Sequence, residues 1–431
     1  MTQTPADTII SFLSYSSNAT EGLTPLRNLP DRKWRRILTW LDEAGLALYF
    51  LDKVIQTDST RQIPSWVISR LERCLLANQA RVSELSAQFA RLNQSFAAAN
   101  VSFAVVKGFS MVPQYCPDAS LRHQGDLDYL IDEASIGAAE RIVLEAGYNL
   151  KPRTSSQEFI FIKPGNGPPS QSQDQYSPLS PHAVELHLNM WDSDQHPLPE
   201  IPHLFSPARA QSHSWNELSF PALNDPDAFL LQVLHACQHL FTYWIRMSSL
   251  YEIGFFLNHR SSDTLLWNQV KQRVGENRIV REFVVVVSQL SAKLFAAPLP
   301  DLIQDWARET RPAVRTWIDH YSRECALCDV PAYEFRFLPK AKLVLFLQQQ
   351  YVDECRDKQV LRTRLLKSTR VARMVESVKA QPSLLLNRFW WKRQLVIRRT
   401  LFHAMAGLRY LLEIPRWQWL NRTKTSPLGS I

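Results

Sequence analysis

The chain has 431 residues, of which 45% are hydrophobic and 21% are charged. These proportions are those of an ordinary globular protein, and the length predicts two or three domains. The first 30 residues show no signal-peptide pattern, and no run approaches 18 uninterrupted apolar residues, so we expect no membrane span. Six scattered cysteines do not resemble a disulfide framework, which predicts a cytoplasmic protein.

Charge is distributed unevenly along the chain. The net charge is +8, but residues 330–431 contain 20 Lys+Arg and 6 Asp+Glu, a local balance of +14 that leaves −6 for the rest. If this section is helical, Arg388, Lys392 and Arg399 share one face. Two interpretations stay open. The face is solvated, or it binds an anionic partner, namely nucleic acid, anionic membrane or an acidic protein.

Residues 1–100 are predicted to be helical. An apolar stripe with helical spacing runs from Trp34 to Leu41, after Asp31 as a candidate N-cap. A second, longer stripe runs from Ser65 to about Ala99, directly after Pro64.

Short β-prone segments then alternate with turns. We predict strands at 101–106, 125–131, 158–163 and 183–188, a helical turn at 109–115 and a helix at 133–147. The stretch 164–182 is rich in Pro, Ser, Gln and Gly, so we expect a disordered or poorly packed loop at one edge of the sheet. Replacing Gly165 to Ser180 with a short Gly-Ser linker should then cost little stability.

This pattern predicts an α+β protein with a small mixed sheet between helical sections. The expected divisions are an N-terminal helical section (1–100), an α/β core (101–223), a helical section packed on the core (224–329) and a basic helical C-terminal section (330–431).

An acidic pair on a predicted strand carries the chemistry. Asp126 and Asp128 are two residues apart, so their side chains project from one face of the strand. Such carboxylates can hold Mg²⁺ or Mn²⁺, which prefer oxygen ligands and often share them with substrate phosphates. Glu185 lies on another predicted strand, and we expect it to converge with the pair in a two-metal site.

Lys107-Gly108 precedes the acidic pair, at the end of a predicted strand and the start of a helical turn. Backbone N–H groups at such a junction can face a phosphate. Arg122 suits oxyanion recognition because its guanidinium can bind two oxygens at once.

The run VVKGFSMVPQYCPDASLRHQGDLDYLI resembles the uncharacterised bacterial nucleotidyltransferase family, part of the polymerase-β-like superfamily. The resemblance spans roughly 30–260, and it also includes Tyr115, the Glu185-Leu186-His187 strand and a helix with His235 and His239. It implies that Asp126, Asp128 and Glu185 bind metal and act in catalysis. It further implies that the nucleotide contacts Lys107, Gly108, Ser110, Arg122 and Gly125.

Two departures from the wider superfamily stand out. Lys107-Gly108 replaces the Gly-Ser of its better-known branch, with Ser110 as a substitute hydroxyl, and the third acid is Glu rather than Asp. His187 has two interpretations, of which a hydrogen-bonded structural histidine is favoured. His235 and His239 have two interpretations as well. They bind a metal, or they pack in the core as structural residues, and the second is favoured.

The sequence therefore predicts a Mg²⁺-dependent enzyme that transfers a nucleotidyl group from a nucleoside triphosphate to an acceptor hydroxyl or phosphate. Two other hypotheses stay open. One is a nucleotide-binding or scaffold protein with a decayed site, and the other is a protein that binds polyanions or membrane surfaces through its basic C-terminal section.

Overall fold

The computed structural model describes residues 4–16, 22–152, 155–163, 175–191, 199, 201, 203–241, 245–327, 339–354, 401 and 404–422. They form two compact units. The first takes its described residues from 1–195, 201–239 and 245–310, and the second from 196–200, 240–244 and 311–431. The basic residues Arg388, Lys392 and Arg399 lie outside the described residues, so their role stays a prediction.

The first unit is built on a seven-stranded mixed sheet in the order β3-β4-β5-β2-β1-β7-β6. Its strands are β1 (Phe103–Val105), β2 (Asp126–Ile131), β3 (Asn149–Leu150), β4 (Glu158–Lys163), β5 (His182–His187), β6 (Ala210–Trp215) and β7 (Leu218–Leu223). β2 runs antiparallel to β1 and parallel to β5. The mixed α/β architecture with flanking helices confirms the predicted fold class.

The helices of this unit were largely anticipated. They are α1 (Pro5–Phe12), α2 (Asp31–Ala44), α3 (Ala47–Gln56), α4 (Ser65–Ala98), α5 (Ile136–Glu145), α7 (Met247–Arg260), α8 (Thr264–Val274), α9 (Arg278–Phe295) and α10 (Asp301–Glu309). α6 (Asp225–Phe241) begins here and ends in the second unit. The expected N-cap was wrong. Pro30 occupies that position, and Asp31 instead accepts a hydrogen bond from the Trp66 indole at 3.1 Å.

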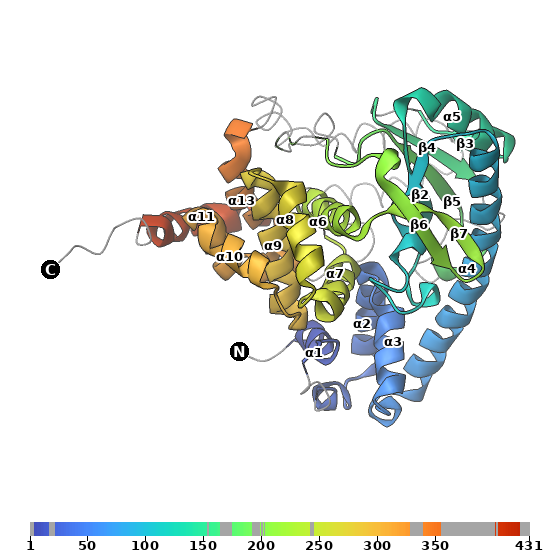
Figure 1. The fold of residues 1–431 in the computed structure, drawn as a ribbon. Helices are drawn as coiled ribbons and strands as arrows, with labels where there is room; N and C mark the ends of the chain where they lie inside the picture. Colours follow the sequence, from blue (N-terminus) through green and yellow to red (C-terminus); the bar gives the residue numbers. More distant parts are fainter. Residues whose placement is uncertain are drawn as a thin grey trace, which may run out of the picture. The chain divides into compact units, whose positions relative to one another are not determined.

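One face of the sheet packs on α4, which runs alongside the strands in Figure 1. On β2 the odd-numbered side chains point this way. The Tyr129 ring packs edge-on against Phe96 with ring centroids 5.2 Å apart, and Asn93 Nδ2 donates to the Tyr129 hydroxyl at 3.3 Å. Both residues on α4 are buried, so α4 closes this face of the core.

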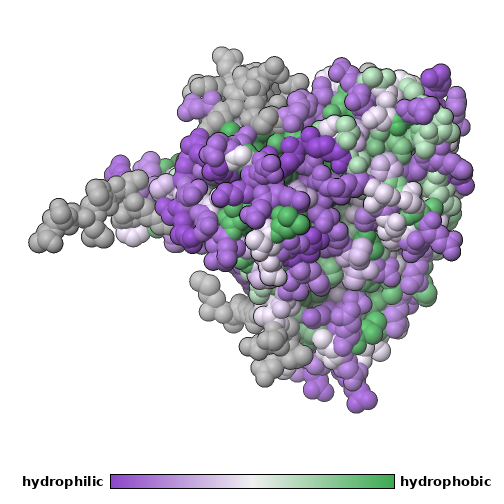
Figure 2. Space-filling view, viewed as in Figure 1, coloured by the Kyte–Doolittle hydropathy of each residue, from purple (hydrophilic) through white to green (hydrophobic). Residues whose placement is uncertain are grey.

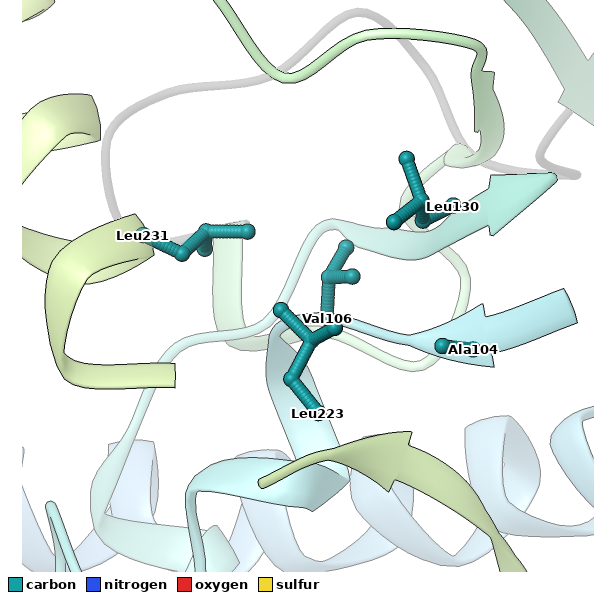
Figure 3. Packing of buried hydrophobic residues seen from close by; sticks show 5 residues of the cluster. All are labelled: Ala104, Val106, Leu130, Leu223 and Leu231. Carbon is teal, nitrogen blue, oxygen red and sulfur yellow. The ribbon is translucent and has the colours of Figure 1, made fainter. Parts of the chain in front are cut away.

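The opposite face packs on α6. Ala104, Val106, Leu130 and Leu223 of the sheet form a buried cluster with Leu231 of α6 (Figure 3). Leu130 shares its face of β2 with Asp126 and Asp128, because side chains alternate along a strand. The acidic pair therefore lies on the α6 face of the sheet, next to a hydrophobic cluster.

The 164–182 prediction is only partly open to examination. Residues 164–174 lie outside the described residues, but the stretch from 175 is anchored. Tyr176 is 1% exposed, and its hydroxyl donates to Asp42 at 3.3 Å. Arg81 donates to the carbonyls of Ser177 and Ser180 at 3.0 and 3.1 Å. For this part the expectation of poor packing was wrong, because one aromatic ring and backbone acceptors supply the anchor.

The second unit is helical where described. It contains α11 (Pro312–His320), α12 (Ser322–Ala326), α13 (Leu345–Gln348) and a helix over 404–422. Phe346 and Trp417 stack with ring centroids 4.8 Å apart, and the Tyr321 hydroxyl donates to Glu413 at 3.1 Å. These contacts join the 404–422 helix to the rest of the unit.

No helix among the described residues has both the length and the apolar character needed to cross a bilayer. The face drawn in Figure 2 is mainly hydrophilic, with hydrophobic side chains scattered over it.

Candidate active site

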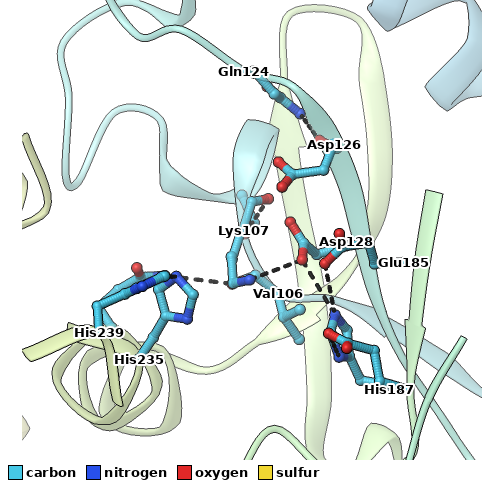
Figure 4. A network of polar contacts seen from close by, with 12 residues as sticks. Val106, Lys107, Gln124, Asp126, Asp128, Glu185, His187, His235 and His239 are labelled. Carbon is cyan, nitrogen blue, oxygen red and sulfur yellow. Dashed lines mark hydrogen bonds and ion pairs between the residues drawn. The ribbon is translucent and has the colours of Figure 1, made fainter. Parts of the chain in front are cut away.

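The register between β2 and β5 positions the acidic residues. Asp128 pairs with Glu185 across the parallel strands, so their side chains project from the same face. Asp126, two residues earlier on β2, projects from that face too. Figure 4 shows the three carboxyl groups grouped beside Lys107 and His187. The sheet therefore brings together acids that lie far apart in the sequence.

Asp128 makes the densest set of polar contacts. Its Oδ1 accepts a hydrogen bond from Lys107 Nζ at 2.8 Å and lies 3.2 Å from His187 Nε2. Lys107 comes from the end of β1, and both Lys107 and Asp128 are buried. A buried carboxylate needs a charge partner, and in the metal-free protein Lys107 provides one.

The electrostatics separate the acids. Burial raises the pKa of the Asp128 carboxyl, but attraction to Lys107 and the hydrogen bond with His187 outweigh burial and hold this pKa well below its usual range. Burial and repulsion from Asp128 raise the pKa of Asp126. Burial and the two aspartates raise the pKa of Glu185. The positive charges that act on these acids, Lys107 together with Arg122 and Arg246 at Asp126, therefore fall short of offsetting burial and mutual repulsion at Asp126 and Glu185.

This shortage fits a divalent cation. One ligand atom each from Asp128, Glu185 and His187 lies within 4.8 Å of the others. Asp126 is not in that group, although it projects from the same face of β2. Carboxylate oxygens are the donors that Mg²⁺ prefers, whereas an imidazole suits softer metals. The hydrogen bond between His187 and Asp128 indicates that His187 orients the carboxylate. The sequence had favoured a hydrogen-bonded structural histidine at position 187. It had not identified Asp128 as the partner of this histidine.

Gly108 adopts φ +62°, and a Cβ at this position would lie 2.3 Å from Gln124 Nε2. The left-handed φ favours glycine at this position, and the Gln124 amide packs against it while donating to the Asp126 carbonyl at 3.0 Å. No sequence signal marked Gln124. The turn after Lys107 is a short 3₁₀ helix (Gly108–Met111) rather than the predicted turn over 109–115.

The remaining residues expected to contact nucleotide have local partners. Ser110 Oγ donates to the Lys107 carbonyl at 3.1 Å. The Gly125 carbonyl accepts from Ala183 N at 3.0 Å, which joins the start of β2 to β5. Arg122 Nε lies 3.2 Å from Glu252 Oε1 of α7, an acid that the sequence did not single out. The contacts of these residues with a nucleotide stay predictions.

The family model for uncharacterised nucleotidyltransferases matches residues 30–296. The chain belongs to this family. A comparison with curated proteins finds no match. The matched region contains the whole sheet and the helices α2 to α9. It therefore includes every candidate site residue.

The histidine pair of this nucleotidyltransferase lies beside Lys107. His235 and His239 project from α6, and their Nε2 atoms are 3.1 Å apart. Burial, and then Lys107, lowers the pKa of His235 well below its usual range. A neutral His235 adds no charge to the surroundings of Lys107. The pair lies on the Lys107 side of the site (Figure 4).

The raised pKa of Glu185 predicts a pH effect on stability. In metal-free protein, the folded state retains a proton that the unfolded state loses above about pH 4.5, the ordinary value for this carboxyl. The free energy of unfolding should therefore fall as pH rises from 4.5 through the raised pKa of Glu185. The depressed pKa of Asp128 acts in a separate window, below its ordinary 3.8.

Denaturant titrations without divalent ions, at several pH values, measure this effect. Glu185→Gln should show a smaller decline than the wild type above pH 4.5, whereas Glu276→Gln, at a side chain 97% exposed, should behave like the wild type. A stability difference between wild type and Glu185→Gln that is constant across pH would contradict the assignment.

Proposed function

We propose that this family member catalyses Mg²⁺-dependent transfer of a nucleotidyl group from a nucleoside triphosphate to an acceptor hydroxyl or phosphate. The observation that carries the proposal is the shared face of Asp126, Asp128 and Glu185, set beside a buried lysine. Family membership supports the reaction class. The scattered cysteines of the sequence support a cytoplasmic site of action.

Asp126, Asp128 and Glu185 would hold Mg²⁺ or Mn²⁺, with His187 orienting Asp128. When bound, the cation supplies charge neutralisation on the phosphates and activation of the attacking oxygen. The acceptor oxygen forms a bond to the α-phosphorus, and the bond from that phosphorus to the α,β-bridging oxygen breaks. Pyrophosphate leaves with the bonding electrons, and an acceptor hydroxyl gives its proton to a carboxylate of the site or to solvent.

Lys107 has two roles in this proposal. In the metal-free protein its ammonium neutralises Asp128 at 2.8 Å. When a cation compensates the carboxylates, the ammonium is available to a phosphate oxygen of the substrate. Gly108, Ser110, Arg122 and Gly125 are the further residues proposed to line the nucleotide.

Release of pyrophosphate tests the proposal against a decayed site that only binds nucleotide. The purified chain is incubated with each nucleoside triphosphate, Mg²⁺ and a cell extract. Endogenous nucleoside triphosphates and pyrophosphatase activity are removed from the extract beforehand. We expect pyrophosphate release that depends on the chain and on Mg²⁺. Mg²⁺-dependent binding of triphosphate without any pyrophosphate release would favour the scaffold hypothesis.

A further inference from the structure

Two arginines from distant parts of the chain interact electrostatically with each other and with Asp126. Arg122 precedes β2, and Arg246 directly precedes α7. Burial lowers the pKa of Arg246, and repulsion from Arg122 lowers it further. Both also act on the Asp126 carboxyl. Together with Lys107, the two guanidinium groups are positive charges that act on Asp126.

The carboxylate that pairs with Arg122 is shared with another donor. Glu252 Oε1, 3.2 Å from Arg122 Nε, also accepts a hydrogen bond from the Tyr49 hydroxyl at 2.9 Å. Arg122 Nη1 is buried and has no hydrogen-bond partner among the described residues. Since an unsatisfied buried donor is costly, this nitrogen indicates an acceptor beyond those that the described residues provide.

Arg246 contacts a neutral ring. Arg246 Nη2 lies 3.4 Å from His123 Nδ1. Burial, followed by repulsion from Arg246, lowers the pKa of His123 well below its usual range, so Nδ1 can accept this hydrogen bond. His123 therefore positions Arg246 without neutralising it.

The backbone makes room for Arg246. Gly45, which ends α2, adopts φ +72°, and a Cβ there would lie 2.6 Å from Arg246 Nε. The guanidinium packs closely against this glycine, so the surrounding chain determines its place. Arg246, packed on Gly45 and hydrogen-bonded to His123, and Arg122, with an Nη1 unpaired among the described residues, offer guanidinium donors of the kind that bind phosphate oxygens in pairs.

We propose that Arg122 and Arg246 together bind the polyphosphate tail of the nucleoside triphosphate, with Arg246 as a binding residue that sequence reasoning did not identify. This inference rests on the proposed function. Asp126 by itself would repel the tail, so tail binding should strengthen when Mg²⁺ compensates the carboxylates. The two guanidinium groups would then oppose the charge of the leaving pyrophosphate.

Binding of inorganic tripolyphosphate in the presence of Mg²⁺, measured by isothermal calorimetry on the full chain, tests the inference. Arg246→Gln should weaken binding about 10- to 100-fold, the loss typical of a hydrogen bond to a charged group. Arg246→Lys, which retains the charge, should weaken it less. The matched control is Arg281→Gln, because Arg281 is comparably buried at 21% exposed and pairs with Glu276 away from the site.

Several outcomes would overturn the inference. They are equal binding by wild type and Arg246→Gln, no tripolyphosphate binding by the wild type, and an equal loss in Arg281→Gln. If Arg246→Gln does not fold, Arg246→Met takes its place, and wild-type affinity in Arg246→Met has the same meaning. Tripolyphosphate binding does not require transfer, so the two proposals fail separately. Arg246-dependent binding without pyrophosphate release defeats only the proposed function, whereas transfer with normal binding by Arg246→Gln defeats only this inference.

Discussion

Asp126→Asn should lower the rate of nucleotidyl transfer at least about 1,000-fold, because a metal-ligating carboxylate contributes several kcal/mol to stabilising the transition state. The fold should survive this change. Burial and Asp128 raise the pKa of Asp126, so the ionised carboxyl is disfavoured in the metal-free protein. A neutral amide of the same shape should leave the free energy of unfolding unchanged or slightly higher.

The measurements are pyrophosphate release and denaturant unfolding on the same preparation. Asp52→Asn is a matched control, since Asp52 is a partly buried carboxyl outside the site whose pKa is also raised by burial. It should retain full activity. If Asp126→Asn retained full activity too, the chemistry would have to lie elsewhere in the chain.

Lys107→Met should destabilise the metal-free protein by about 3–5 kcal/mol, the usual cost of leaving one member of a buried ion pair without its partner. Asp128 would lose the ammonium at 2.8 Å, and Asp126 and Glu185 would add their repulsion. Mg²⁺ should restore much of this loss, because the cation supplies the charge that the lysine had supplied.

Denaturant unfolding with and without Mg²⁺ measures both effects. The stabilisation by Mg²⁺ should be larger in Lys107→Met than in the wild type, where the ammonium competes for the same carboxylate. Lys163→Met, on β4, should show the wild-type response. If Mg²⁺ stabilised Lys107→Met no more than the wild type, Lys107 and the cation would not share Asp128.

The acidic strand could be predicted because its signal is local. In Asp126-Leu127-Asp128 the alternation alone places both acids on one face, and β2 confirms the strand. The partnership with Glu185 depends on the parallel register of β2 and β5, which is a property of the topology. Sequence reasoning offered Glu185 as a candidate from its strand, but its position opposite Asp128 comes only from the structure.

The edge of the sheet was missed for identifiable reasons. β6 and β7 form a hairpin in which Pro221 lies within a strand, a position that argues against a strand assignment. The turn contains Asn216 at φ +52° followed by Glu217, not by the glycine that usually marks such a turn. Polar residues on the exposed β6 gave no alternating hydrophobic pattern.

The arginine pair shows another limit of sequence reasoning. Arg122 was selected because its guanidinium suits oxyanion recognition and because the family resemblance includes it. Arg246 directly precedes α7 and Glu252 lies on it, and nothing in their spacing links them to Asp126. Their contacts come from tertiary packing, in which Glu252 pairs with Arg122 and Arg246 forms a hydrogen bond with His123.

The position of a radioactive label tests the central claim most directly. The chain is incubated with Mg²⁺, cell extract and a nucleoside triphosphate labelled at either the α- or the γ-phosphate. The account predicts that α-label enters a product while γ-label leaves as pyrophosphate, and that neither occurs with Asp126→Asn. Entry of γ-label into the product would indicate phosphoryl transfer, and product labelling that persists in Asp126→Asn would contradict the assigned site.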